Sequence, residues 1–229
     1  MPLSWQEPGA LQALLDRLRG PEPLEPLLLL LDRGAVGGHP PPADLRALLP
    51  WQDQQRLEAF RRPEDQQRFL LGRGCLRLIL GRLLGRDPAR LPLVCGPHGK
   101  PALAEAEGPC FNLSHAGDLV LLAFHPRRPV GVDVERLRPT LDWRPIARRV
   151  LTQAECETLE GQAGDDPSAA DRAFLQAWCR LEARLKALGV GLGGLSQLEG
   201  ETVDPAPEDV WDVIVPVGYR AAVALMPPA

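Results

Sequence analysis

Short apolar runs, separated by turns and flanked by helical patterns, most limit how this chain can fold. Between residues 91 and 134 the runs are 93–95, 109–114, 119–124 and 130–134, and glycine, proline and polar residues divide them. Such runs predict strands. Further strands are predicted at 27–31, 210–215 and 219–225. Strands and helices thus occur twice in a similar order, once in each half of the chain.

The segments around these runs repeat their apolar residues at helical spacing. Helices are predicted at 11–19, 43–60, 63–84, 143–151, 152–160 and 168–188. Pro63 is suited to a first helical position, where its missing N–H has no cost. Thr152 and Glu155 have the spacing of a capping box, and Gly189 is a typical helix-ending glycine.

Composition excludes several classes of protein. The longest apolar run, 27–31, is far shorter than the roughly 20 residues that cross a bilayer, so no membrane protein is expected. The amino-terminal residues show no basic segment followed by an apolar stretch, so we expect no secretory signal and a cytoplasmic protein. The formal net charge of −4 argues against non-specific nucleic-acid binding. Five widely spaced cysteines indicate neither a disulfide framework nor structural zinc.

The charge is unevenly distributed. Between Arg61 and Arg90, eight arginines stand against three acidic residues. This excess fits either the solvated face of a helix or a surface that binds an anion such as a phosphorylated cofactor. The residues alone leave both interpretations open.

Three short motifs carry side chains that could bind a ligand or take part in catalysis. In Val130–Glu135, Asp133 and Glu135 are two residues apart on a predicted strand, so both carboxylates point to one face, where they could bind a hard cation such as Mg²⁺. Glu182 and Lys186 are four apart and share a helix face. Ser114 and His115 end the run that begins at Phe111. Each motif by itself also fits an exposed strand end, a surface ion pair or a structural histidine.

In order and spacing, the motifs resemble those of the 4′-phosphopantetheinyl transferases, specifically the larger, surfactin-synthetase-activating class. The resemblance extends over nearly the whole chain after the first 25 residues. The matching segments are 60–73, 99–101, 111–115, 131–135 and 178–189.

The resemblance implies an α+β pseudo-dimer of two similar halves, with the active site in the cleft between them. We expect the amino-terminal half at 1–125, with elements that bind coenzyme A, and the carboxy-terminal half at 126–229, with the metal-binding carboxylates and the catalytic helix. By the same resemblance, Mg²⁺ is held by Asp133, Glu135 and Glu182. Ser114 and His115 contact the 3′-phosphate of coenzyme A, and the adenine site is lined by Gly99, Lys100 and Pro101.

The resemblance also gives roles to the basic residues. Arg56 and Arg68 fall near the cofactor phosphates, and Lys186 reaches the pyrophosphate. Glu182, or a water molecule that it orients, takes the proton of the attacking serine. The expected product is a holo acyl or peptidyl carrier protein, and the expected enzyme is a monomer.

One position departs from the family pattern. The family usually has lysine directly before the metal-binding glutamate, whereas this chain has Leu181. The departure keeps two alternatives open: a non-catalytic module that binds coenzyme A or a carrier protein, and a soluble structural domain whose carboxylates are merely exposed. Turnover separates the first from an enzyme, and binding of coenzyme A separates the second.

Overall fold

The computed structural model describes residues 1–5, 7, 9–21, 23–35, 42–105, 108–138, 142–194 and 209–227. Its helices are α1 (Ala10–Arg19), α2 (Pro42–Ala47), α3 (Trp51–Ala59), α4 (Pro63–Leu84), α5 (Arg144–Val150), α6 (Gln153–Asp165) and α7 (Pro167–Leu188). Its strands are β1 (Leu3–Ser4), β2 (Leu27–Asp32), β3 (Leu93–Cys95), β4 (Pro101–Leu103), β5 (Cys110–Ala116), β6 (Leu119–His125), β7 (Val130–Arg136), β8 (Val210–Asp212) and β9 (Tyr219–Leu225).

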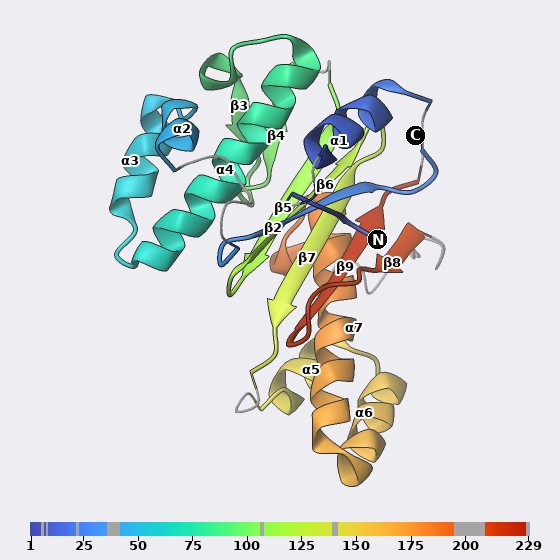
Figure 1. Cartoon of the computed structure of the whole chain (residues 1–229). Coiled ribbons are helices and arrows are strands. Elements are labelled where there is room, and N and C mark those ends of the chain that lie inside the picture. Colours follow the sequence, from blue (N-terminus) through green and yellow to red (C-terminus); the bar gives the residue numbers. More distant parts are fainter. Residues whose placement is uncertain are drawn as a thin grey trace.

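Two sheets form the centre of the molecule (Figure 1). The first has the strand order β1-β2-β6-β5, and the second β7-β9-β8. All neighbours are antiparallel except β1 and β2. Strands β3 and β4 pair with each other as a separate hairpin.

Strand β6 shows how the sheets are covered, because all of its residues are buried. Val120, Leu122 and Phe124 pack with α1 and α4 on one face. The alternate residues, including Leu119 and Leu121, face β7 and β9 of the second sheet. A strand with both faces buried reads as a continuous apolar run, which is how this segment appears in the sequence.

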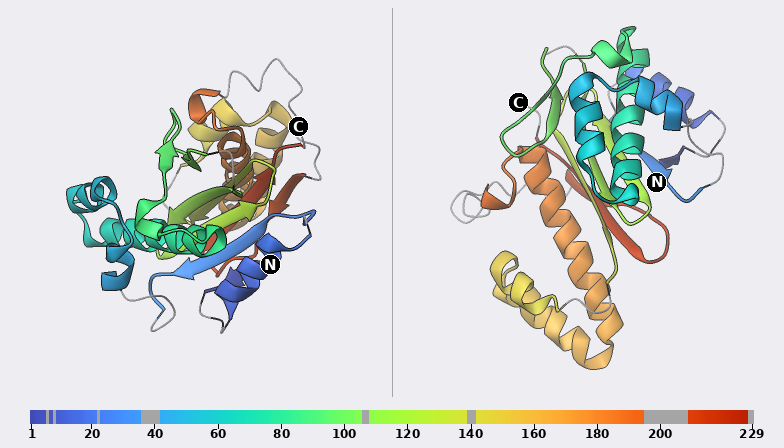
Figure 2. Two further views of the ribbon diagram at one scale, coloured as in Figure 1. Left: turned by 90° about the horizontal axis from the view of Figure 1, so that it is seen from above. Right: turned by 90° about the vertical axis from the view of Figure 1, so that its left-hand side faces the viewer.

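Each sheet has one long helix on its outer face (Figure 2). Helices α4 and α7 are both 22 residues long, and both begin with proline. Both end at a glycine in the left-handed region, Gly85 and Gly189, which needs no Cβ there. The predicted α+β class with two similar halves is confirmed.

The predicted helices and strands largely occur where the sequence places them, including the capping box of Thr152 and Glu155. The single helix predicted over 43–60 is wrong, because Pro50 has an extended conformation and divides it into α2 and α3. Strand β8 stops at Asp212 rather than at 215, and α6 continues to Asp165 rather than ending at 160. None of the described helices combines the length and the apolar composition that crossing a membrane requires.

Candidate active site

The two halves meet along the edge strands β5 and β7. Side chains of β5 supply the hydrogen-bond acceptors: Asn112 Oδ1 accepts from the Val132 N–H at 2.9 Å, and Ser114 Oγ accepts from the Val134 N–H at 3.4 Å. Side-chain oxygens of alternate residues on β5 therefore accept the hydrogen bonds from β7 that backbone carbonyls would accept within a continuous sheet. This fixes the register in which Ser114 faces Asp133.

Gly131 brings the helix α7 directly onto β7. A Cβ at this position would lie 2.0 Å from the carbonyl oxygen of Ala183 and 2.2 Å from the backbone nitrogen of Ala187. Only glycine permits so close an approach. Because side chains alternate along a strand, Gly131, Asp133 and Glu135 share the face that meets α7.

A cavity of about 340 Å³ lies where these elements meet. Three elements line it: β5 with Leu113, Ser114 and His115, β7 with Asp133 and Glu135, and α7 with Trp178, Glu182 and Lys186. The structure thus gathers all three predicted metal-binding carboxylates, together with Lys186, Ser114 and His115, around one cavity between the halves.

Asp133 is the most buried of these acidic groups, with 3% of its surface exposed. Its Oδ1 accepts from Lys186 Nζ at 2.6 Å and from Ser114 Oγ at 2.9 Å. Its Oδ2 is buried and accepts no N–H or O–H within the described part of the chain. The nearby thiol of Cys179 donates to the Arg220 carbonyl at 3.4 Å, and burial beside Asp133 raises its pKa.

Glu135 and Glu182 are half-buried, and the charges of Asp133 and Lys186 act on both. Burial raises the pKa of Glu135, and the charges of Asp133 and Glu182 raise it further, against the opposing effect of Arg138 and Lys186. Burial also raises the pKa of Glu182, aided by Asp133 and opposed by Lys186. Among the described residues, neither glutamate forms an ion pair.

This set of donors fits a hard divalent cation in type and charge. Carboxylate oxygens are the ligands that Mg²⁺ prefers, and one buried oxygen of Asp133 lacks a polar donor within the described residues. The side chains do not yet converge: within the described ranges, no group of three acidic, histidine or cysteine residues is placed to share a metal ion. The ammonium of Lys186 instead neutralises Asp133.

His115 lines the β5 side of the cavity, and Arg68 lies near enough for its charge to act on His115. The His115 side chain is exposed at the surface, yet partial desolvation lowers its pKa, and the positive charge of Arg68 lowers it further. Arg68 donates from Nη1 to the Gly117 carbonyl at 2.8 Å and is also paired with Asp65. His115, next to an arginine fixed by a hydrogen bond and an ion pair, could bind an anion.

Several predicted cofactor residues do not line this cavity: Arg68, Arg56, Gly99, Lys100 and Pro101. Arg56 is exposed on α3, and its guanidinium carbon lies 5.5 Å from the centre of the Phe69 ring. Gly99, Lys100 and Pro101 form the turn into β4, and the Lys100 ammonium is directed at backbone carbonyls of β7 and α7. Their predicted contacts with the cofactor stay predictions.

Two residues of the arginine-rich segment have a structural role. Arg73 and Arg77 each donate to Oδ2 of Asp53 at 3.1 Å, and Arg77 is only 2% exposed. Burial lowers the pKa of Arg77, while the charge of Asp53 raises it. They fit neither the solvated-face nor the anion-surface interpretation, because they join α3 to α4.

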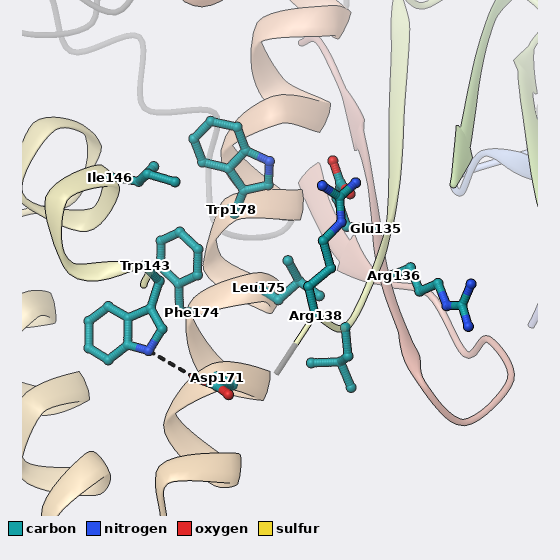
Figure 3. A pocket seen from close by; sticks show the side chains of 10 residues that line it. Glu135, Arg136, Arg138, Trp143, Ile146, Asp171, Phe174, Leu175 and Trp178 are labelled. Atoms are coloured by element: carbon teal, nitrogen blue, oxygen red, sulfur yellow. Dashed lines mark hydrogen bonds between the residues drawn. The ribbon is translucent and has the colours of Figure 1, made fainter. Parts of the chain in front are cut away.

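A second cavity of about 220 Å³ adjoins the first and shares Glu135 and Trp178 with it (Figure 3). Three aromatic residues contribute to its wall, Trp143, Phe174 and Trp178. Trp143 and Phe174 stack with ring centres 5.6 Å apart, and Trp143 Nε1 donates to Asp171 at 3.0 Å. Two exposed arginines, Arg136 and Arg138, stand beside it.

Sequence reasoning missed two residues that shape the site. Asn112 is a buried amide in an otherwise apolar run, and its polarity, two positions before Ser114, is a usable signal. Gly131 stands beside the predicted carboxylates, yet its part in helix packing leaves no signal in sequence, because a glycine in a strand has several possible causes.

Comparison with known proteins identifies the family of this chain. A family model described as the 4'-phosphopantetheinyl transferase superfamily matches residues 129–215, and one described as 4'-phosphopantetheinyl transferase, N-terminal, matches residues 42–127. The chain is 36% identical over 170 residues to a putative 4'-phosphopantetheinyl transferase of Synechocystis, an alignment that covers 73% of this chain and 65% of that protein.

Two further relatives carry the same description. Identity to the 4'-phosphopantetheinyl transferase HetI of Nostoc is 37% over 159 residues, 68% of this chain and 66% of the relative. Identity to Sfp of Bacillus subtilis is 29% over 140 residues, 61% of this chain and 59% of the relative. The matched part spans a little under two thirds of these relatives. The two family models together account for most of the chain, which therefore belongs to the 4′-phosphopantetheinyl transferase superfamily.

Proposed function

We propose that this protein transfers the 4′-phosphopantetheine arm of coenzyme A to a serine of an apo acyl or peptidyl carrier protein and releases 3′,5′-ADP. Family membership supports the reaction type. The observation that carries the proposal is the single cavity in which Asp133, Glu135, Glu182 and Lys186 of one half face His115 of the other.

Mg²⁺ is the metal we propose for the site, held by Asp133, Glu135 and Glu182. When bound, it would offset the charge of the pyrophosphate of coenzyme A. The raised pKa values of the two glutamates support this assignment, because a nearby divalent cation would favour the ionised forms that burial, and secondarily the neighbouring carboxylates, disfavour.

Lys186 neutralises Asp133 in the free protein and is only 29% exposed. Its flexible stem lets the ammonium exchange Asp133 Oδ1 for a phosphate oxygen of the cofactor. There it would offset the charge that develops on the leaving 3′,5′-ADP.

Glu182 is the proposed general base. The serine Oγ attacks the phosphorus that carries the pantetheine, the bond from that phosphorus to the bridging oxygen breaks, and 3′,5′-ADP leaves with the bonding electron pair. The serine proton passes to a Glu182 carboxylate oxygen, directly or through a water that it orients. A pKa raised by burial suits this part, since a stronger base accepts the proton more readily.

The nucleotide end of coenzyme A is assigned to the amino-terminal half. His115 and Arg68 are proposed to bind the 3′-phosphate, because His115 lines the cavity and Arg68 is near enough for its charge to act on His115. Ser114 already donates to Asp133 Oδ1, so we assign it first the task of orienting that carboxylate. The segment 99–101, with Arg56 farther away, is proposed for the adenine and phosphate contacts.

The aromatic cavity beside Glu135 is the proposed approach for the carrier protein. It opens next to the carboxylates, and Arg136 and Arg138 stand at its border. Carrier proteins present their serine on a short acidic helix, which two exposed arginines complement.

We propose a monomer that acts in the cytoplasm. One chain supplies both sides of the cavity, so no second copy is needed to complete it. The five cysteines are free, which suits a reducing compartment.

The test is transfer itself. Purified protein, Mg²⁺ and coenzyme A are incubated with a panel of apo carriers from fatty-acid, polyketide and peptide synthesis, and the added arm is detected by mass spectrometry. Asp133→Asn, which removes the charge and keeps the shape, should abolish transfer. Asp212→Asn is the matched control, because Asp212 pairs with Arg180 at the surface.

Two results would contradict the proposal. Binding of carriers and coenzyme A without transfer to any of them would identify a non-catalytic module. Full transfer by Asp133→Asn at ordinary Mg²⁺ concentrations would remove the metal assignment.

A further inference from the structure

The ammonium of Lys100 is held by backbone atoms of the other half of the molecule. Its Nζ donates to the carbonyls of Lys186 at 2.6 Å, Val130 at 3.0 Å and Ala187 at 3.1 Å. An ammonium has three N–H donors, so all three are used. Two of the acceptors end α7, and the third opens β7.

These carbonyls need hydrogen-bond donors once the chain is folded. The last carbonyls of a helix have no partner within the helix, and a positive charge at that end is favourable. Lys100 provides both the donor and the charge from a segment 86 residues away in sequence. Burial lowers the pKa of Lys100 to about 8, which leaves the ammonium form in the majority at neutral pH.

The rest of the β3–β4 turn also contacts this end of α7. A Cβ on Gly191, just beyond the helix, would lie 3.1 Å from Nδ1 of His98. The turn between β3 and β4 therefore packs against the segment that follows α7, and the Lys100 side chain extends to the last carbonyls of α7. At Gly131 the helix and β7 are already in backbone contact.

Lysine itself is scarce in this chain. Of its 26 basic residues, only Lys100 and Lys186 are lysines, and the remaining 24 are arginines. The two lysines are joined directly, because the ammonium of one binds the backbone carbonyl of the other. A compact ammonium can meet three carbonyls that converge on one point, whereas a planar guanidinium spreads its donors apart.

We propose that Lys100 is a positioning residue: it fixes the end of α7 against β7 and thereby sets where the Lys186 ammonium stands relative to Asp133. The inference rests on the proposed transfer reaction for its kinetic consequence. It gives the Lys100 ammonium a role other than binding adenine, because none of its donors is left for a ligand, so the adenine contact proposed for the segment 99–101 would be made by backbone atoms and by the neighbours of Lys100.

The test compares Lys100→Met, which keeps the stem and removes the ammonium, with wild type. Displacing a catalytic group by about 1 Å costs on the order of 100-fold in rate, so kcat at saturating coenzyme A should fall by about 10- to 100-fold. The Kd for 3′,5′-ADP, measured by calorimetry, should change much less than kcat. Arg86→Met is the matched control, since its exposed pair with Glu105 lies beside the same hairpin.

A second measurement needs no carrier or turnover. In Lys100→Met, Lys186 is the remaining lysine, so its acetylation by a limiting reagent can be followed by peptide mass spectrometry. Freeing the end of α7 should speed this acetylation about tenfold over wild type. The alkylation rate of the buried Cys75 reports whether the whole protein has opened instead.

Three outcomes overturn the proposal. The first is a weaker Kd for 3′,5′-ADP with unchanged kcat, which makes Lys100 a ligand contact. The second is unchanged kinetics, and the third is unchanged acetylation of Lys186. If wild type transfers the arm to no carrier, the proposed function fails, while the acetylation comparison still decides the part of Lys100. If Lys100→Met does not fold, Lys100→Arg keeps the charge and should show the same changes in smaller degree.

Discussion

The ammonium of Lys186 lies 2.6 Å from Oδ1 of Asp133, so a side chain of the protein itself neutralises the most buried carboxylate of the site. The pair joins α7 to β7 inside the cavity. A metal ion at Asp133 would compete with this ammonium. In our proposal the competition is useful, since it releases Lys186 for the phosphates of the cofactor.

Replacing His115 by alanine should raise the KM for coenzyme A by about 10- to 100-fold, because a hydrogen bond to a charged group contributes about 1.5–3 kcal/mol. With dephospho-coenzyme A, which lacks the 3′-phosphate, the change should be much smaller. Steady-state kinetics with both substrates measure the difference. An equal rise for both would place His115 elsewhere on the ligand.

Stabilisation by Mg²⁺ should depend on pH. The folded-state pKa values of Glu135 and Glu182 are raised, so their contribution to stability is greatest below the ordinary carboxyl pKa and is lost as pH rises through the raised values. Mg²⁺ binds the ionised form and should offset this loss. The rise in thermal midpoint on adding Mg²⁺ should therefore be larger at neutral than at acidic pH.

The matching control for that experiment is Glu182→Gln, which should show a smaller rise at neutral pH. Equal stabilisation of wild type at both pH values would show that these glutamates do not take part. At a concentration of 100 times Kd, a ligand that binds only the folded state adds about 2.7 kcal/mol, which is readily measured.

Gly131→Ala should destabilise the protein and impair transfer. The new Cβ would lie 2.0 Å from the Ala183 carbonyl oxygen, so α7 must move away from β7. Overpacking of this kind typically costs roughly 1–3 kcal/mol in the free energy of unfolding, measured with denaturant.

Gly161→Ala is the matched control, because a Cβ added there on α6 would meet no atom of the described residues within 4 Å. It should stabilise the protein by about 0.5–1 kcal/mol, as alanine is the better helix former. Unaltered stability and activity in Gly131→Ala would contradict the backbone contact.

Leu181→Lys should leave the thermal midpoint nearly unchanged and improve transfer modestly. Leu181 is half-buried on α7, so a lysine stem can extend toward solvent and place its charge beside the site. Steady-state kinetics and thermal unfolding on one preparation provide the measurement.

Leu185→Lys is the comparison, since Leu185 is fully buried and an unpaired ammonium there should cost several kcal/mol. For a protein of this size about 1 kcal/mol lowers the midpoint by roughly 2–4 °C. A large fall for Leu181→Lys would show that Leu181 belongs to the core and that the site formed without a lysine there.

Local chemistry made much of the structure predictable. The limits of α4 and α7, the capping box of Thr152 and the strands β6 and β9 follow from signals within a few residues: proline, glycine, a hydroxyl three residues before a carboxylate, and apolar runs. The carboxylates at 133 and 135 and the pair at 182 and 186 share faces by the same periodicity. These features needed no knowledge of distant parts of the chain.

The sequence by itself thus determined the elements, the α+β halves and which side chains stand together on each element. Only the tertiary structure decided what those faces meet: Arg77 meets buried Asp53, Asn112 caps the backbone of β7, and Lys100 binds carbonyls on α7. The physical reason is that hydrogen bonds and ion pairs between distant segments depend on how helices and sheets pack, and residue type fixes only what a side chain is able to bind.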